Sequence, residues 1–147
     1  MRRLVFVLGI LAIGGEAHCQ RTNHGTDADS AGYAVVRDKD GGETRVHLGA
    51  GPIPPEFPPT MALYPGAEFN STARTAKSVV LSLSTKDSLE AVFAFYRKQP
   101  GYDEISDLEV DDMRVLHLKH RASGKDFQVV AKIDGRTTKV SLVAPLG

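Results

Sequence analysis

Acidic side chains are the most concentrated group in this sequence that could do chemistry. Between residues 103 and 112 the chain places Asp103, Glu104, Asp107, Glu109, Asp111 and Asp112. Paired carboxylates act as general acid and base or hold calcium, so this cluster supports one hypothesis, a small hydrolase or metal-dependent enzyme. The spacing lacks the glycine and the closing glutamate of an EF-hand loop. The favoured interpretation is a solvated strand edge whose like charges discourage pairing with other strands.

Histidines are the second source of candidate ligands for the enzyme hypothesis. His117 and His120 are three residues apart in a segment that is predicted to be a strand. An odd spacing on a strand puts two side chains on opposite faces, so these two share a metal only if the strand ends by Lys119. We therefore predict no metal site and no cofactor.

Nucleophile and phosphate-binding motifs are missing from the sequence. The serines stand in neither a G-x-S-x-G elbow nor an S-x-x-K pair, and Gly41-Gly42 lacks the lysine and the following helix of a phosphate loop. Cys19 lies in a polar segment that has no means of fixing a base beside it. No residue is therefore assigned as catalytic. Whether the protein is an enzyme stays open, and the non-catalytic interpretation is favoured.

The overall charge argues against nucleic acid as a partner. The 147 residues carry 18 Lys and Arg against 18 Asp and Glu, a formal net charge of +0. Binding to phosphate backbones needs a basic excess that displaces counterions. The single cysteine excludes an internal disulfide framework, and the length suits one domain.

Residues 1–17 are predicted to be a signal peptide. Arg2 and Arg3 precede an apolar run over residues 4–13, and small residues follow the run. The run is shorter than the about 20 residues that a membrane-spanning helix needs. We therefore expect an exported protein, located in the periplasm, in the extracellular space or on a membrane as a lipoprotein.

Cys19 separates two ways of processing this leader. Gly15 and Ala17 stand at the −3 and −1 positions of a cleavage site after residue 17, which suits an ordinary signal peptidase. Cleavage before Cys19 would instead expose the position that bacterial lipoproteins modify, although Glu16 and His18 depart from the usual lipobox. Cys19 is thus a candidate lipidation site, and a lipid on it is the one membrane contact that we expect.

Two segments follow the leader. Residues 18–32 are polar and are predicted to form a disordered tether, because they bury too little apolar surface to offset chain entropy. Residues 33–50 hold two β-prone runs around a turn rich in aspartate and glycine, and they are predicted to form a β-hairpin. An isolated hairpin is marginally stable in water, so this one must lie on something larger. Whether it joins the main sheet is left open.

Residues 51–66 are rich in proline and are predicted to form an extended strap that ends in a turn. Five prolines lie within residues 51–59, a density that favours polyproline II. In the favoured interpretation Ile53 and Phe57 anchor the strap to the domain surface. The alternative is a ligand for an aromatic-lined groove.

Residues 67–147 are predicted to be a compact α+β domain. Residues 78–84 alternate like a strand, and a helix is expected over residues 88–98, with Asp87 as its N-cap, Glu90 three residues later, and Phe93 and Tyr96 buried. Four strand candidates follow between residues 102 and 143. The expected fold class is α+β, with one helix packed on a mainly antiparallel sheet of about five or six strands.

Several motifs resemble a family of small uncharacterised exported bacterial proteins, many of them lipoproteins. The shared parts are a proline-rich lead (residues 54–58), the turn Leu63-Tyr64-Pro65-Gly66-Ala67, the strand end Thr85-Lys86-Asp87-Ser88 and the helix end Phe95-Tyr96. The family usually has Gly-Trp after the helix, where this chain has Gly101-Tyr102. The resemblance covers roughly residues 51–143 and implies an exported α+β domain. It implies no activity and no functional residues.

These observations favour an exported, non-catalytic envelope or secreted module that binds an envelope protein or a surface component. An exposed sheet face, carrying Gln128, Val130, Lys132, Lys139, Ser141 and Val143, is one expected contact surface. The alternative is the hydrolase or metal-dependent enzyme built on the Asp103–Asp112 cluster or on His117 and His120.

Overall fold

The computed structural model describes residues 33–37, 42–49 and 51–147. The predicted signal peptide (1–17), the predicted tether (18–32) and Cys19 lie outside the described residues. Within the described ranges, no helix has the length and the apolar character needed to cross a membrane.

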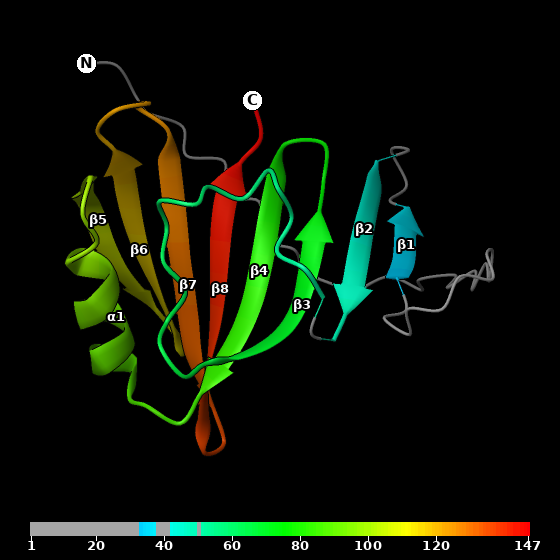
Figure 1. Ribbon diagram of the computed structural model, residues 1–147. Coiled ribbons are helices and arrows are strands. Elements are labelled where there is room, and N and C mark those ends of the chain that lie inside the picture. Colours follow the sequence, from blue (N-terminus) through cyan, green and yellow to red (C-terminus); the bar gives the residue numbers. More distant parts are fainter. Residues whose placement is uncertain (1–32, 38–41, 50) are drawn as a thin grey trace.

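A single antiparallel sheet organises this part of the chain (Figure 1). Its strands are β1 (Tyr33–Arg37), β2 (Glu43–Leu48), β3 (Glu68–Arg74), β4 (Ser78–Thr85), β5 (Tyr102–Val110), β6 (Met113–His120), β7 (Asp126–Asp134) and β8 (Thr137–Pro145). Their order in space is β1-β2-β3-β4-β8-β7-β6-β5. The first four strands and the last four each form a meander, and the β4–β8 pairing joins the two meanders.

This architecture shows that the predicted fold class is wrong. Instead of one helix on a sheet of about five or six strands, the structure has an eight-stranded sheet. Strands make up 55% and helix 8% of the described chain, so this is a sheet-dominated fold. The difference arises at the N-terminal side, because the hairpin joins the main sheet through β3, which was not predicted. The β3 sequence EFNSTAR lacks the alternation of apolar and polar residues that marks a strand.

The helix α1 (Leu89–Arg97) follows β4 and leads the chain across to the far edge of the sheet. Its N-cap is Ser88 rather than the predicted Asp87, and the Ser88 side chain accepts a hydrogen bond from the amide of Ala91 at 3.2 Å. Phe93 and Tyr96 are completely buried, as expected from their spacing. Gly101, at φ +84°, makes the turn into β5 in a conformation that favours glycine.

Residues 51–66 run as a strap over the sheet face that also carries α1 (Figure 1). Phe57, Met61 and Tyr64 are buried in the same core cluster as the helix residues. Ile53, the other predicted anchor, is 46% exposed. The Thr60 hydroxyl lies 2.8 Å from the Tyr102 hydroxyl, which fixes the strap to the start of β5.

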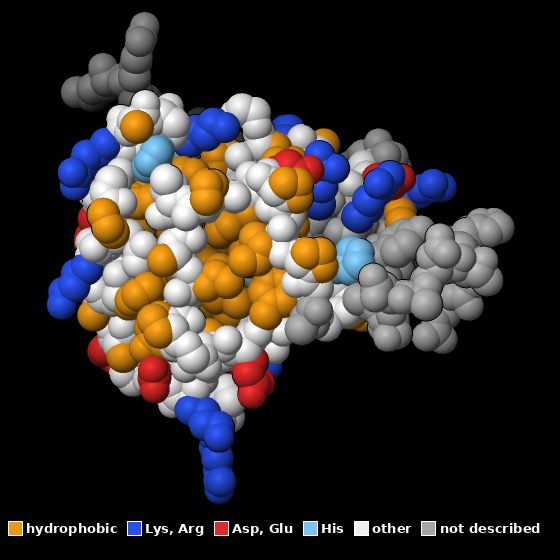
Figure 2. All heavy atoms as spheres, in the orientation of Figure 1, with side chains coloured by type: hydrophobic (Ala, Val, Ile, Leu, Met, Phe, Trp, Pro, Cys, Tyr) orange, Lys and Arg blue, Asp and Glu red, His pale blue; other side chains and the backbone are white. Residues whose placement is uncertain are grey.

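The two faces of the sheet differ in what covers them. The covered face, beneath α1 and the strap, carries the buried residues Val79, Leu81, Leu83, Leu116, Leu118, Phe127, Val129, Ala131, Val140, Leu142 and Ala144. Figure 2 shows the molecule from this side, with apolar side chains gathered in the middle and charged ones around the rim. The opposite, open face carries Val80, Val115, Val130 and Val143, which are half-buried.

Candidate binding cleft

A cleft of about 580 Å³ lies between the first three strands and the beginning of the strap. Its lining consists of Val35, Arg37, Glu43, Arg45, His47, Pro52, Pro54, Thr72 and Arg74. This volume falls within the range of about 300–1,000 Å³ that is usual for small-molecule sites. Three of the nine lining residues are arginines, although the chain as a whole is neutral.

Strand register brings these side chains together from distant parts of the sequence. Arg37 is opposite Glu43, and Val35 is opposite Arg45, across β1 and β2. Arg45 is in turn opposite Arg74 across β2 and β3. Directly opposed residues project to the same face of a sheet, so the three arginines lie side by side on the covered face.

Ion pairs already occupy part of this cluster. Arg45 donates a hydrogen bond from Nε to the Glu43 carboxylate at 2.8 Å, and a nitrogen of Arg37 lies 3.8 Å from the same carboxylate. The hydrogen bond from Arg45 is the main reason that the pKa of Glu43 is lowered. Arg74 lies 3.1 Å from Glu56, a residue of the strap. These ion pairs show that the guanidinium groups of the cleft can bind a carboxylate.

The remaining walls are apolar or weakly polar. Val35, Pro52 and Pro54 provide aliphatic surface, and Thr72 adds a hydroxyl at 7% exposure. Guanidinium groups bind carboxylate and phosphate through paired hydrogen bonds, and proline rings contact short hydrocarbon segments. The lining therefore suits a small ligand that has an oxyanion next to an apolar part.

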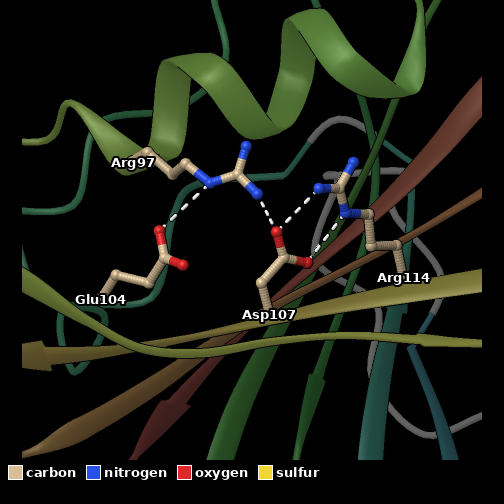
Figure 3. Close-up of polar contacts among 4 residues, drawn as sticks. All are labelled: Arg97, Glu104, Asp107 and Arg114. Carbon is tan, nitrogen blue, oxygen red and sulfur yellow. Dashed lines mark hydrogen bonds and ion pairs between the residues drawn. The ribbon is translucent and has the colours of Figure 1, made fainter.

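The acidic cluster of β5 is divided between the two sheet faces and is engaged in ion pairs. Glu104 and Asp107 face α1, where Arg97 bridges them (Figure 3). Arg114 holds both carboxylate oxygens of Asp107, at 2.8 and 2.7 Å, and its guanidinium carbon lies 4.9 Å from the centre of the Phe93 ring. This network ties the last turn of α1 to β5 and β6.

The rest of the acidic cluster lies at the surface. Asp103 pairs with Arg121 at 2.8 Å, and Glu109, Asp111 and Asp112 are exposed. In the described part of the chain, no group of three or more His, Cys, Asp and Glu side chains is arranged to hold a metal ion.

His117 and His120 lie on opposite faces of the sheet, because β6 continues through His120. His117 is opposite Gln128 on the open face. The His120 ring lies 4.9 Å from the Tyr102 ring, and its Nδ1 lies 2.9 Å from the Ser123 hydroxyl. The structure therefore does not bring the two histidines together.

A second hollow, of about 370 Å³, lies where the strap turns into β3. The turn around Tyr64 and the strand end around Asp87 meet here. The Tyr64 hydroxyl donates to Asp87 Oδ2 at 2.8 Å, and the Thr138 hydroxyl donates to the main-chain carbonyl of Asp87 at 2.7 Å. These contacts give Tyr64 and Asp87 an architectural role.

The cleft residues Arg37, Arg45, His47 and Arg74 were not predicted as site residues from the sequence. A signal for the first three was present, because charged residues alternate with apolar ones in Val36-Arg37 and in Arg45-Val46-His47-Leu48. Arg74 carried no such signal, since it lies on the strand that was not predicted.

No protein-family model, curated protein or solved structure matches this chain.

Proposed function

We propose that the protein is an exported, non-catalytic module that binds an anionic ligand in the cleft between β1, β2, β3 and the strap. The observation that carries this proposal is the gathering of Arg37, Arg45 and Arg74 around one cavity in a protein of zero net charge. Export is supported by the leader-like residues 1–17, and an envelope protein or surface component is the expected source of the ligand.

The chemistry of the lining favours binding over turnover. Arginine stays protonated throughout the physiological range, so it holds an oxyanion well but does not act as a proton-transferring group. The acidic side chains of the enzyme hypothesis lie at the β5 edge of the sheet, far from the cleft. There Glu104 and Asp107 form ion pairs with Arg97. A binding role therefore uses the groups that line the cavity.

Titration with two simple anions, inorganic phosphate and succinate, tests this function. In NMR titrations we expect chemical-shift changes in β1, β2 and β3 that saturate at millimolar anion concentration. In a variant carrying Arg45→Gln and Arg74→Gln, the affinity for the anion should be lower by about tenfold or more. The matched control is Arg136→Gln, on the exposed turn between β7 and β8. If neither anion perturbs these strands, or if the control weakens binding equally, the proposed site is wrong.

Lipidation of Cys19 remains part of this proposal as an alternative to plain secretion. Fractionation of host cells that express the wild-type chain or a Cys19→Ser variant distinguishes the two. Loss of the protein from the membrane fraction in the variant supports a lipid anchor, whereas an unchanged distribution contradicts one.

A further inference from the structure

The two edges of the sheet carry opposite charge. At one edge, the Arg37 and Arg45 side chains of β1 and β2 are 75% and 65% exposed. At the other edge, the acidic side chains of β5 and of its turn are Asp103, Glu104, Asp107, Glu109, Asp111 and Asp112. Arg97, Arg114 and Arg121 pair with Glu104, Asp107 and Asp103, so within the described ranges the acidic side chains without an ion pair at this edge are Glu109, Asp111 and Asp112.

Exposed aliphatic side chains also gather at both edges. Val36 and Leu48 are 45% and 60% exposed at the basic edge, and Leu108 and Val110 are 49% and 42% exposed at the acidic edge. Leu108 is opposite Val115, which lies on the open face, so Leu108 projects to that face too. Val36 alternates with Arg37, which lies on the covered face, so Val36 also projects to the open face. Each edge therefore has charged groups on the covered face and aliphatic groups on the open face.

The directions of the two edge strands make them compatible. All neighbours in the eight-stranded sheet are antiparallel, so β1 and β5 run in opposite directions. A second copy placed beside the first with the same face upward would bring its β5 antiparallel to β1. The β-bulge between Glu104 and Ser106 leaves residues 106–110 as a regular segment, which matches the five residues of β1.

We propose that β1 of one copy pairs with residues 106–110 of a second copy of this chain, so that the sheet continues from copy to copy. The register that places Val36 opposite Leu108 of the next copy keeps the faces matched, and it places Arg37 opposite Asp107 and diagonal to Glu109 of that copy. Within the described ranges Glu109 has no ion pair, so its carboxylate is available to Arg37. The contact joins two different surfaces, which produces rows of copies rather than a closed two-fold dimer.

The same charges oppose pairing between two acidic edges. Two β5 edges paired antiparallel about Leu108 would bring Asp107 of one copy against Glu109 of the other. Like charges on facing strands are destabilising, so the acidic edge rejects its own kind and accepts the basic edge. The acidic edge can therefore prevent pairing with another acidic edge and still allow copies to associate through the basic edge.

A charge exchange between two variants tests the proposal. Arg37→Glu puts a carboxylate where β1 meets the acidic side chains of the next copy, and Glu109→Arg puts a guanidinium group where β5 meets Arg37. Sedimentation velocity on the exported chain should show concentration-dependent association of the wild type and association about tenfold or more weaker in each variant alone. An equimolar mixture should regain large species, because the two substituted side chains then meet with opposite charge at one contact and the wild-type Arg37 and Glu109 meet at the next. Circular dichroism of each variant confirms that it is folded.

Matched controls keep the outcome interpretable. Arg136→Glu and Glu68→Arg make the same charge changes away from both edges and should associate like the wild type. Arg74→Gln, which lowers anion binding in the cleft, should also leave association unchanged, so this proposal and the proposed function fail separately. A wild type that stays monomeric up to about 1 mM, or a mixture no larger than its two components, overturns the proposal.

Discussion

The Tyr64 hydroxyl donates a hydrogen bond to Asp87 Oδ2 at 2.8 Å and so joins the end of the strap to the loop that begins α1. The carbonyl of Asp87 accepts a second hydrogen bond, from Thr138 in β8. Three segments that are distant in the sequence therefore meet at one residue. The turn around Tyr64 and the strand end around Asp87, two motifs noted in the sequence, are the two ends of one contact.

Removing the Tyr64 hydroxyl should destabilise the protein. In Tyr64→Phe the ring stays packed against Phe95, at 5.3 Å between centroids, but the hydrogen bond to the carboxylate is lost. We expect the free energy of unfolding to fall by about 1 kcal/mol, measured by urea denaturation. An unchanged free energy of unfolding would mean that the contact contributes nothing to stability.

Removing the Tyr96 hydroxyl should have the opposite sign. The Tyr96 side chain is 0% exposed, and its hydroxyl, which lies near the Tyr64 backbone, makes no hydrogen bond of good geometry among the described residues. A buried hydroxyl without a partner carries a desolvation penalty that phenylalanine avoids. Tyr96→Phe should therefore leave the free energy of unfolding unchanged or raise it by up to about 1 kcal/mol. A loss as large as that of Tyr64→Phe would contradict this account.

Alkaline pH should unfold the protein through its tyrosines. Burial raises the pKa of Tyr96 far above its usual range and also raises that of Tyr102, and the hydrogen bond to Asp87 raises the pKa of Tyr64. Above about pH 10 the unfolded chain loses these protons while the folded chain keeps them, so stability falls as pH rises. The contribution of Tyr96 to this slope approaches about 1.4 kcal/mol per pH unit, because its pKa is raised the most.

Urea denaturation at a series of alkaline pH values measures that slope. The Tyr96→Phe variant serves as the control, and its free energy of unfolding should fall less steeply with pH because one buried phenol is gone. Equal slopes for the variant and the wild type would exclude Tyr96 as a source of the effect.

Asp107 should be the most important carboxylate of the acidic cluster for stability. Its side chain is 17% exposed and binds both Arg97 and Arg114. Asp107→Asn leaves two guanidinium groups near the core without their counter-charge, and we expect a loss of about 2 kcal/mol in the free energy of unfolding. Glu104→Gln is the control, since Glu104 is 43% exposed and should cost less than about 1 kcal/mol.

Ser88 should stabilise the start of α1. Its side chain caps the amide of Ala91, so Ser88→Ala should lower the free energy of unfolding by about 1 kcal/mol. Glu90→Ala removes only a charge near the helix N-terminus and should cost about 0.5 kcal/mol or less. A larger effect at Glu90 than at Ser88 would mean that charge, rather than the cap, sets the stability of this turn.

Local sequence patterns predicted the elements that carry their own signal. The spacing of Val92, Phe93 and Tyr96 marked the buried side of α1, and Asp134-Gly135 marked the turn between β7 and β8. The size of the sheet was underestimated because β3 holds polar residues such as Asn70 and Thr72. A strand of this kind is stabilised by its neighbours on both sides, and that support is not visible within seven residues of sequence.

The candidate cleft was missed for a related reason. It depends on Arg45 lying opposite Arg74, and that juxtaposition follows only once β3 is known to pair with β2. The predicted N-cap was wrong by one residue because aspartate and serine are both good N-caps. The Asp87 carboxylate instead accepts a hydrogen bond from the Tyr64 hydroxyl, a contact that the local sequence does not reveal.

The position of β8 has a consequence for how the chain acquires its structure. This strand comes last among those described, yet it sits in the middle of the sheet, and its pairing with β4 is the strand pairing that joins the two meanders. A nascent chain that has reached only Gly135 lacks this hydrogen-bonded connection, although the strap can still contact β5 through Thr60 and Tyr102. The complete sheet therefore forms late, after synthesis of Thr137–Pro145, and removal of this strand should abolish cooperative unfolding of the sheet.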